Sequence, residues 1–512
     1  MKSLLMHPDR NFEWQSELPL QAKDLVADLG LNVLFDAMAG GDQLLLGVVQ
    51  RAVLCNLSNP ATIIYRQQAW TDCLERPDVV LALYALAVDT LKEKREIWGF
   101  LSNYSPDLNL SHAVQVMQLM IKKLKRLREI AVESGQRFRS PAFKRFFAML
   151  LEELDDPYFE LVNAHLQRLK FGRGVPVSAK LGRGNAGVDF VLRRSLEEKQ
   201  RWSDIVPELV PVLGPRGRRL AFEVHPRDEA GHQALEELRA RGINFVADAL
   251  SQSADHVTNF FVQLRAELAF YVACLNLHST LLQKGYRTCL PVPLAASHTT
   301  LSSRGLYDVS LALTLEGRAV DNDVNADGKR LVVVTGANQG GKSTFLRSAG
   351  LAQLMMQAGM FVAAREFRAN VATGVFTHFK REEDATMISG KLDEELRRMS
   401  GIVDHIQSGA ILFANESFAS TNEREGSDIG EEVLGALNSA GVKVLLVTHL
   451  YDLAERLRRD HVDGVHFLRA ERLPDGTRTF KVRPGEALAT SFGKDLYDEI
   501  FGGDGSGKCS VP

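Results

Sequence analysis

A glycine-rich segment between an apolar run and a helix-prone run constrains this chain more than any other feature of its sequence. Residues 331–334 are Leu-Val-Val-Val and residues 345–347 are Phe-Leu-Arg, as expected for a strand before a loop and a helix after it. In a phosphate-binding loop, or Walker A motif, consecutive backbone N–H groups and the helix N-terminus face phosphates. A coincidental glycine-rich turn is the alternative, and the flanking elements disfavour it. The predicted ATP-binding residues are Gly336, Ala337, Asn338, Gln339, Gly340, Gly341, Lys342, Ser343 and Thr344.

Two further apolar runs end in polar residues that suit the same chemistry. Lys342 should contact the β- and γ-phosphates, and the Ser343 hydroxyl should face Mg²⁺. Residues 411–414 are apolar and lead into Asn415-Glu416. We therefore predict Glu416 as the catalytic base that acts on water in line with the γ-phosphate, with an exposed strand-end carboxylate as the alternative.

A third run, residues 442–447, ends in Thr448-His449. Open α/β folds bind ligands at the carboxyl ends of their strands, so His449 should reach the γ-phosphate or position the water. An isolated histidine is more often structural, but three strand ends that converge on one edge favour the functional interpretation.

Apolar periodicity divides the chain into five segments. Residues 1–170 carry apolar residues at three- and four-residue steps, typical of a helical core or lever domain. Residues 171–250 contain a Gly-rich hairpin pattern and then a strand, helix and strand pattern with strands at 220–224 and 243–246, which predicts a small α+β insert with a clamp-like role. Helices return over residues 251–290. Residues 291–503 alternate strands and helices, and the Gly-rich residues 504–512 predict a flexible tail.

The predicted fold class is thus an α/β P-loop ATPase domain preceded by a mainly α-helical core or lever domain with a small α+β insert. The ATPase domain should contain a largely parallel sheet, because its apolar runs are continuous. A hairpin over residues 465–470 and 477–482 should follow, around the turn Pro474-Asp475-Gly476.

Composition neither supports nor excludes a nucleic-acid partner. The chain of 512 residues has 61 Lys and Arg against 64 Asp and Glu, so contacts to DNA would need a local basic patch. Residues 1–20 lack a continuous apolar stretch, so we expect no signal peptide, no membrane partner and a cytoplasmic location. The five cysteines have no metal-type spacing and are expected to be reduced.

Four ordered motifs resemble the MutS family of DNA mismatch repair ATPases. They are TGANQGGKSTFLR at residues 335–347, NESFASTNEREG at residues 415–426, Thr448-His449, and Ser491-Phe492-Gly493. Residues 31–36, 59–60 and 64–68 are similar to the beginning of that family's helical core. The resemblance implies an ABC-type ATPase that uses ATP and Mg²⁺, and a homodimer whose subunits pack face to face and complete each other's sites.

The same resemblance suggests which residues face the partner subunit. Ser389 and Gly390 resemble the segment that approaches the partner's γ-phosphate, although the following Leu392-Asp393 departs from the family pattern. Ser420 and Thr421 lie in the Ser/Thr-rich segment that resembles the dimer loop. All four are candidate residues for contact across the dimer.

Two departures from the family pattern affect the expected activity. Asn415 stands where the family has a metal-supporting aspartate, so Ser343 and, indirectly, Asn415 would hold Mg²⁺ with one negative charge fewer, and hydrolysis should be slow. The chain also begins close to the helical core and contains no Phe-x-Glu motif. We therefore expect no N-terminal mismatch-recognition domain and no mismatch recognition by the usual wedge.

Basic residues in two places are candidates for contact with double-stranded or branched DNA. The first group lies in the long helical segment and the second in the predicted insert; a solvated helix face explains the first group equally well. The candidates are Lys122, Lys123, Lys125 and Arg126, and then Arg183, Arg193 and Arg194.

The resulting hypothesis is an ATP-dependent DNA-binding protein of the MutS type, in repair or recombination. ATP binding and hydrolysis at the dimer interface would control helical arms that grip DNA. The alternative is a nucleotide-gated scaffold in which Asn415 leaves little or no hydrolysis. An ATPase that serves a membrane transporter is a third possibility, which the helical N-terminal half disfavours.

Overall fold

The computed structural model describes residues 1–98, 106–169, 177–181, 187–192, 229–381, 390–460 and 464–488. The chain forms two compact units. Unit 1 comprises Met1, Ala85–Gly135 and Phe147–Leu264, and unit 2 comprises Lys2–Tyr84, Gln136–Phe146 and Arg265–Pro512.

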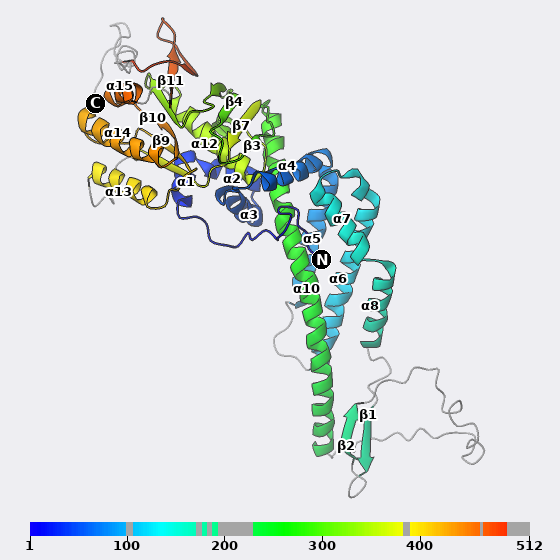
Figure 1. Cartoon of the computed structure of the whole chain (residues 1–512). Helices are drawn as coiled ribbons and strands as arrows, with labels where there is room; N and C mark the ends of the chain where they lie inside the picture. Colours follow the sequence, from blue (N-terminus) through cyan, green and yellow to red (C-terminus); the bar gives the residue numbers. More distant parts are fainter. Residues whose placement is uncertain are drawn as a thin grey trace, which may run out of the picture. The chain divides into compact units, whose positions relative to one another are not determined.

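Unit 1 is built mainly from helices that are cross-linked by ion pairs. Its elements include most of α5 (Pro77–Trp98), α6 (Pro106–Ser134), α8 (Asp156–Leu169) and the first part of α10 (Glu229–Gln283). Lys94 on α5 contacts Asp255 on α10 at 2.8 Å. These helices agree with the helical periodicity of the N-terminal sequence (Figure 1).

Proline marks where several helices in the N-terminal part of the chain begin. Pro60, Pro77, Pro106 and Pro141 are the first residues of α4 (Pro60–Glu75), α5, α6 and α7 (Pro141–Glu153). A proline fits there because its missing N–H would have no partner within the helix and its fixed φ is already helical.

The predicted insert is confirmed in one part and wrong in another. Strands β1 (Val177–Leu181) and β2 (Gly187–Leu192) pair antiparallel, as the hairpin pattern predicts. Residues 243–246, which we predicted as a strand, lie inside the α-helix α10, so the chain is already helical from Glu229 and not only from residue 251. The pattern Ile-Asn-Phe-Val, with three apolar residues of four, fits one turn of a helix as well as a strand, and the pattern alone does not separate them. Residues 220–224 and the tail 504–512 lie outside the described residues.

The part of α10 from Val246 to Gln283 has the length and composition of a membrane-spanning helix. Of its apolar window, 72% is buried within the protein. Packing against other parts of the chain therefore accounts for this apolar composition.

Unit 2 contains a six-stranded sheet in the order β12-β11-β6-β10-β9-β8. All neighbouring strands are parallel except β11 and β12, which form the predicted hairpin. The strands are β12 (Arg478–Pro484), β11 (Val465–Arg472), β6 (Leu331–Gly336), β10 (Lys443–Val447), β9 (Ile411–Asn415) and β8 (Val375–Phe379).

Helices pack on this sheet, and side chains of its strands form a core with them. Leu412 and Val444 pack in one core with Met399, Leu434 and Leu453. Those three residues belong to α13 (Lys391–Val403), α14 (Glu423–Ser439) and α15 (Tyr451–Asp460), which therefore cover one face. Helix α12 (Lys342–Ala358) also packs against β6, β9 and β10 (Figure 1).

A second sheet of four short strands in unit 2 was not predicted. Its order is β3-β7-β4-β5, with β3 (Val292–Leu294), β7 (Glu366–Asn370), β4 (Leu301–Leu306) and β5 (Asn322–Asn325). The remaining helices of unit 2 are α1 (Ala22–Leu29), α2 (Leu31–Ala39), α3 (Gln43–Leu54) and α11 (Val309–Thr314). α1 packs on β8 and α3 packs on α12.

The N-terminal segment is part of the core of unit 2. Leu5 and Met6 are fully buried, and the backbone N–H groups of Leu5 and Phe12 donate to the carboxylate of Glu267 at 2.6 and 3.1 Å. The Tyr271 hydroxyl donates to the Leu5 carbonyl at 2.7 Å. Side chains therefore satisfy backbone groups that no sheet or helix pairs here.

Candidate active site

The loop that joins β6 to α12 has the backbone conformation of a phosphate-binding loop. Gly336, Gln339 and Gly341 have φ values of 109°, 57° and 88°. A Cβ on Gly340 would lie 2.8 Å from the Ala337 carbonyl oxygen, so a larger residue would force the loop to shift. The positive φ values of Gly336 and Gly341 and the crowding at Gly340 explain why the sequence has glycine at these three positions.

Lys342 is fixed by its own loop. Its Nζ donates to the carbonyl oxygens of Gly336 and Ala337, both at 2.9 Å, and the residue is only 5% exposed. Burial lowers the pKa of Lys342, and the nearby Glu416 carboxylate partly opposes that shift. The lysine is the cation expected against a triphosphate.

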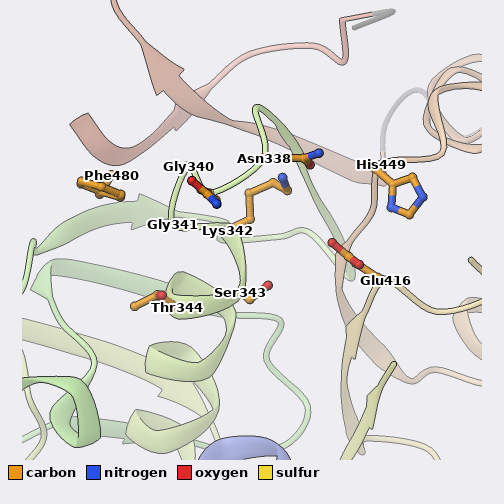
Figure 2. A pocket seen from close by; sticks show the side chains of 10 residues that line it. Asn338, Gly340, Gly341, Lys342, Ser343, Thr344, Glu416, His449 and Phe480 are labelled. Atoms are coloured by element: carbon orange, nitrogen blue, oxygen red, sulfur yellow. The ribbon is translucent and has the colours of Figure 1, made fainter. Parts of the chain in front are cut away.

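The three predicted strand ends meet around one pocket (Figure 2). The pocket has a volume of about 480 Å³ and is lined by Asn338, Gln339, Gly340, Gly341, Lys342, Ser343, Thr344, Glu416, His449 and Phe480. Glu416 and His449 lie on the same side of the loop, and Phe480 lies on the opposite side. The structure thus brings Lys342 together with Glu416 and His449, as the sequence predicts.

Backbone hydrogen bonds hold the strand ends in register. Glu416 N donates to the Val447 carbonyl at 2.8 Å, which ties the end of β9 to β10. Thr448 N donates to the Val334 carbonyl at 3.1 Å, which ties β10 to β6. The carboxylate and the imidazole therefore project from neighbouring strands of the parallel part of the sheet.

Glu423 links the helices that follow these two strand ends. It is the first residue of α14, and its Oε1 accepts hydrogen bonds from the backbone N–H groups of Tyr451 and Asp452 at 2.9 and 3.3 Å. Those groups belong to the first turn of α15, directly after His449 and Leu450. A carboxylate at this position satisfies two donors that have no partner within their own helix.

Ser343 and Asn415 form the pair expected beside a metal ion. The Ser343 hydroxyl donates to Asn415 Oδ1 at 2.7 Å. No cluster of three or more His, Cys, Asp or Glu side chains suited to a metal occurs in the described part of the chain. A serine hydroxyl and an amide oxygen are oxygen ligands of the kind that Mg²⁺ takes beside phosphate and water, so this pair fits the ion.

Phe480 is the pocket residue that sequence reasoning missed. It lies in β12, has a φ of 58° and is 48% exposed. Asn322 fixes its backbone: the side chain donates to the Phe480 carbonyl at 3.5 Å and accepts from Val482 N at 2.7 Å. A single aromatic residue in a hairpin carries no sequence signal for this role.

The residues predicted to face a partner subunit have local roles in the single chain. Gly390 is the N-cap of α13, and Ser389 lies outside the described residues. Ser420 and Thr421 are half-buried before α14, and the Thr421 hydroxyl donates to Glu425 at 2.6 Å. Contact across a dimer stays a prediction.

The candidate DNA-binding lysines and arginines of α6 lie on a helix face with partners inside unit 1. Lys123 pairs with Glu93 at 2.5 Å, and Arg126 pairs with Glu129 at 2.8 Å. Lys125 lies over the Phe159 ring at 5.3 Å. DNA contact by these residues stays a prediction, with a solvated helix face as the alternative. Lys122 is exposed, and Arg183, Arg193 and Arg194 lie outside the described residues.

Comparison with known proteins gives the same family for two regions of the chain. The family model of the MutS2 N-terminal domain matches residues 58–284, and the model of MutS domain V matches residues 332–497. Motif Ser491-Phe492-Gly493 falls within the second match but outside the described residues.

Several curated proteins named DNA mismatch repair protein MutS are similar to the chain. The protein from Thermotoga maritima is 34% identical over 137 residues, 27% of this chain and 17% of that protein. The protein from Desulforamulus reducens is 33% identical over 142 residues, 27% of this chain and 16% of that protein. The protein from Chloroflexus aurantiacus is 25% identical over 261 residues, 49% of this chain and 27% of that protein. The matched region therefore spans about a quarter or less of these relatives.

Proposed function

Because this chain belongs to the MutS family, we propose that it binds and hydrolyses ATP at the pocket around Lys342 and that the nucleotide controls its binding to DNA. The observation that carries the proposal is the convergence of Lys342, Glu416 and His449 on one pocket (Figure 2). A buried ammonium, a carboxylate and an imidazole at one sheet edge are the groups that phosphoryl transfer to water requires.

Each side chain has a defined task in this proposal. Lys342 and the loop amides bind the β- and γ-phosphates. Glu416 accepts the proton of the attacking water, and His449 orients that water or contacts the γ-phosphate. Ser343 would hold Mg²⁺ directly and Asn415 would support it; the bound ion would neutralise charge on the phosphate oxygens. Phe480, on the opposite side of the loop, stacks on the adenine base.

Substitution of Glu416 tests this proposal. Glu416→Gln keeps the size of the side chain but removes the base, so steady-state turnover should fall by about a hundredfold or more while ATP binding is retained. Lys342→Ala should instead weaken ATP binding. Asp404→Asn, an exposed change at the C-cap of α13, is the matched control and should leave both quantities unchanged.

The alternative function is a nucleotide-gated scaffold with little hydrolysis. Asn415 favours the scaffold function, because the side-chain amide that accepts the Ser343 hydrogen bond has no negative charge to support the metal ion. Single-turnover hydrolysis separates the two functions. Measurable turnover that Glu416→Gln abolishes supports the enzyme, and tight ATP binding without turnover supports the scaffold.

We place DNA and a second subunit in the same proposal. A cytoplasmic homodimer would bring Ser389, Gly390, Ser420 and Thr421 toward the partner's nucleotide, and helical segments would hold duplex or branched DNA. The family membership supports both statements. ATPase rates and salt-dependent binding should be measured with duplex, branched and single-stranded DNA; turnover and binding that are the same with and without each DNA would remove DNA from the proposal.

A further inference from the structure

The segment that carries Glu416 has an unusual backbone. Glu416 and Phe418 both have left-handed conformations, with φ values of 54° and 65°. Such conformations are unfavourable for residues that carry a side chain, and they persist only where the surroundings enforce them. Ser417 and Phe418 are each 1% exposed, so the packing around them can supply that enforcement.

Glu395 on α13 binds this segment directly. Its Oε1 accepts the backbone N–H of Phe418 at 2.5 Å. The buried residues of α13 are Glu395, Met399 and Ile402, so the carboxylate occupies a core position of an amphipathic helix. Burial of a carboxyl group has an unfavourable desolvation free energy, which an apolar residue at the same position would avoid. The position therefore suits a hydrogen-bonding task better than core packing.

His378 adds a second link between α13 and the same segment. Its Nε2 lies 3.1 Å from the Glu395 carbonyl oxygen, and its Nδ1 lies 2.7 Å from the Ser417 hydroxyl. Burial lowers the pKa of His378 to about 4, so the ring is neutral near pH 7. With the proton on Nε2, the ring donates to the helix carbonyl, and the single hydrogen of the Ser417 hydroxyl is shared between Nδ1 and the His378 carbonyl oxygen, which lies 3.0 Å from Ser417 Oγ. The ring also stacks on Phe418, with centroids 6.0 Å apart.

We infer that Glu395 is a positioning residue for the catalytic base: it holds Phe418 in the left-handed conformation, and so directs Glu416 into the pocket. The inference rests on the proposed ATPase function. Because Glu395 belongs to α13, it also couples the base to that helix. Gly390, the N-cap of α13, is a predicted partner-facing residue, so a displacement of α13 by a second subunit would reach Glu416 through Glu395.

The first test removes the acceptor and then restores it. Glu395→Leu should lower kcat about tenfold to a hundredfold, since a small misplacement of a catalytic group has effects of that size. The affinity for ATP should change less than twofold, because Lys342 and the loop are untouched. Glu395→Gln keeps an amide oxygen for Phe418 N–H and should recover most of the lost turnover. Asp404→Asn on the same helix serves as the control.

A double-substitution series separates positioning from general stability. In the Glu416→Gln background, Glu395→Leu should cause no further loss of turnover, because the base it positions is already gone. A multiplicative loss in that background, or an unchanged kcat in folded Glu395→Leu, would overturn the inference. Should Glu395→Leu fail to fold, Ser417→Ala removes the link to His378 and should lower kcat while ATP affinity is retained.

Hydrogen exchange gives a readout that does not depend on ATP hydrolysis. The Phe418 amide should exchange faster in Glu395→Leu than in the unsubstituted chain, by the loss of its acceptor. Unchanged exchange at Phe418 would refute the positioning role even if turnover fell. A different result would be no ATP turnover in the unsubstituted chain together with faster exchange of the Phe418 amide in Glu395→Leu. That result would contradict the proposed ATPase function but would support the contact between Glu395 and Phe418.

Discussion

Phe480 presents an exposed ring at one end of the nucleotide pocket, and Asn322 fixes the backbone on its C-terminal side through the Phe480 carbonyl and the Val482 N–H. An aromatic ring that stacks on a base contributes about 1–3 kcal/mol to binding in comparable sites. Phe480→Ala should therefore raise the Kd for ATP about tenfold, as measured by equilibrium titration. Phe480→Trp keeps a stacking surface and should bind ATP normally.

Inorganic tripolyphosphate is the matched ligand for this prediction. It offers the same phosphates without a base, so its Kd should be the same for Phe480→Ala and for the unsubstituted chain. An equal weakening for both ligands would mean that the substitution disturbs the loop, whose Gly341 lies against the Phe480 backbone.

Some site residues could be predicted from the sequence because each directly follows a recognisable pattern. Lys342 lies in a glycine-rich motif, and Glu416 and His449 come after apolar runs. Phe480 and Glu395 could not be predicted. Phe480 resembles any aromatic residue of a hairpin, and Glu395 lies within the charged run of residues 393–398, where the core-facing member is evident only from the packing of α13.

At the level of elements, α14 packs unusually closely against the segment that follows β9. A Cβ on Gly426 would lie 2.3 Å from the Phe418 carbonyl oxygen. Gly426→Ala should therefore displace either the helix or the segment, lower the free energy of unfolding by about 1–3 kcal/mol and reduce turnover. Chemical denaturation and ATPase assays check the two effects.

Gly435→Ala is the control on the same helix. A Cβ at Gly435 meets nothing within 4 Å, and alanine favours a helix interior over glycine by about 1 kcal/mol. This variant should be as stable as the unsubstituted chain or more stable, with unchanged turnover. Equal behaviour of the two alanine variants would contradict the close packing of α14 on Phe418.

The strands that are apolar and buried were predicted from the sequence, whereas the shorter and more polar strands were not. β6, β9 and β10 were predictable because they lie inside a sheet with helices packed on it and are apolar almost throughout. The four-stranded sheet was not, because β3 has only three residues and the other three strands contain several polar residues; β4, for example, contains Ser302, Ser303 and Arg304. Residues 243–246 show the reverse case, in which a mainly apolar segment that resembles a strand belongs to a helix.

At the level of the whole molecule, each unit is assembled from segments that are distant in sequence. Helices α5, α7 and α10 each supply residues to both units, since the divisions after Tyr84, Phe146 and Leu264 fall inside these helices. Sequence periodicity cannot locate such a division, because the helical pattern continues through it. The N-terminal segment poses the same difficulty: residues 3–7 are buried, although nothing in their sequence identifies them as part of a core.

Glu267 makes the stability of unit 2 dependent on pH. Burial raises the pKa of the Glu267 carboxyl above its ordinary value of 4.5, although the N–H groups of Leu5 and Phe12 oppose the shift. The folded state then binds a proton more tightly than the unfolded state does. The contribution of Glu267 protonation to the free energy of unfolding is fully present below about pH 4.5, and it is lost as the pH rises through the folded-state pKa.

Chemical denaturation between pH 4 and pH 8 measures this contribution. The difference in unfolding free energy between the unsubstituted chain and Glu267→Gln should change with pH above about 4.5 and then level off, by about 1.4 kcal/mol for each unit of pKa elevation. Parallel curves for the two proteins would show that Glu267 titrates alike when folded and unfolded.

The cap that Glu423 provides to α15 has a mechanical consequence for the two groups proposed to act on water. One carboxylate at the start of α14 grips the start of α15, so the turns that follow Glu416 and His449 share an anchor. A displacement of the segment after Glu416 would therefore be transmitted through Glu423 to the segment after His449, and the reverse. The Glu416 carboxylate and the His449 imidazole are consequently expected to move together. Without the Glu423 carboxylate, each of the two side chains could be displaced independently of the other.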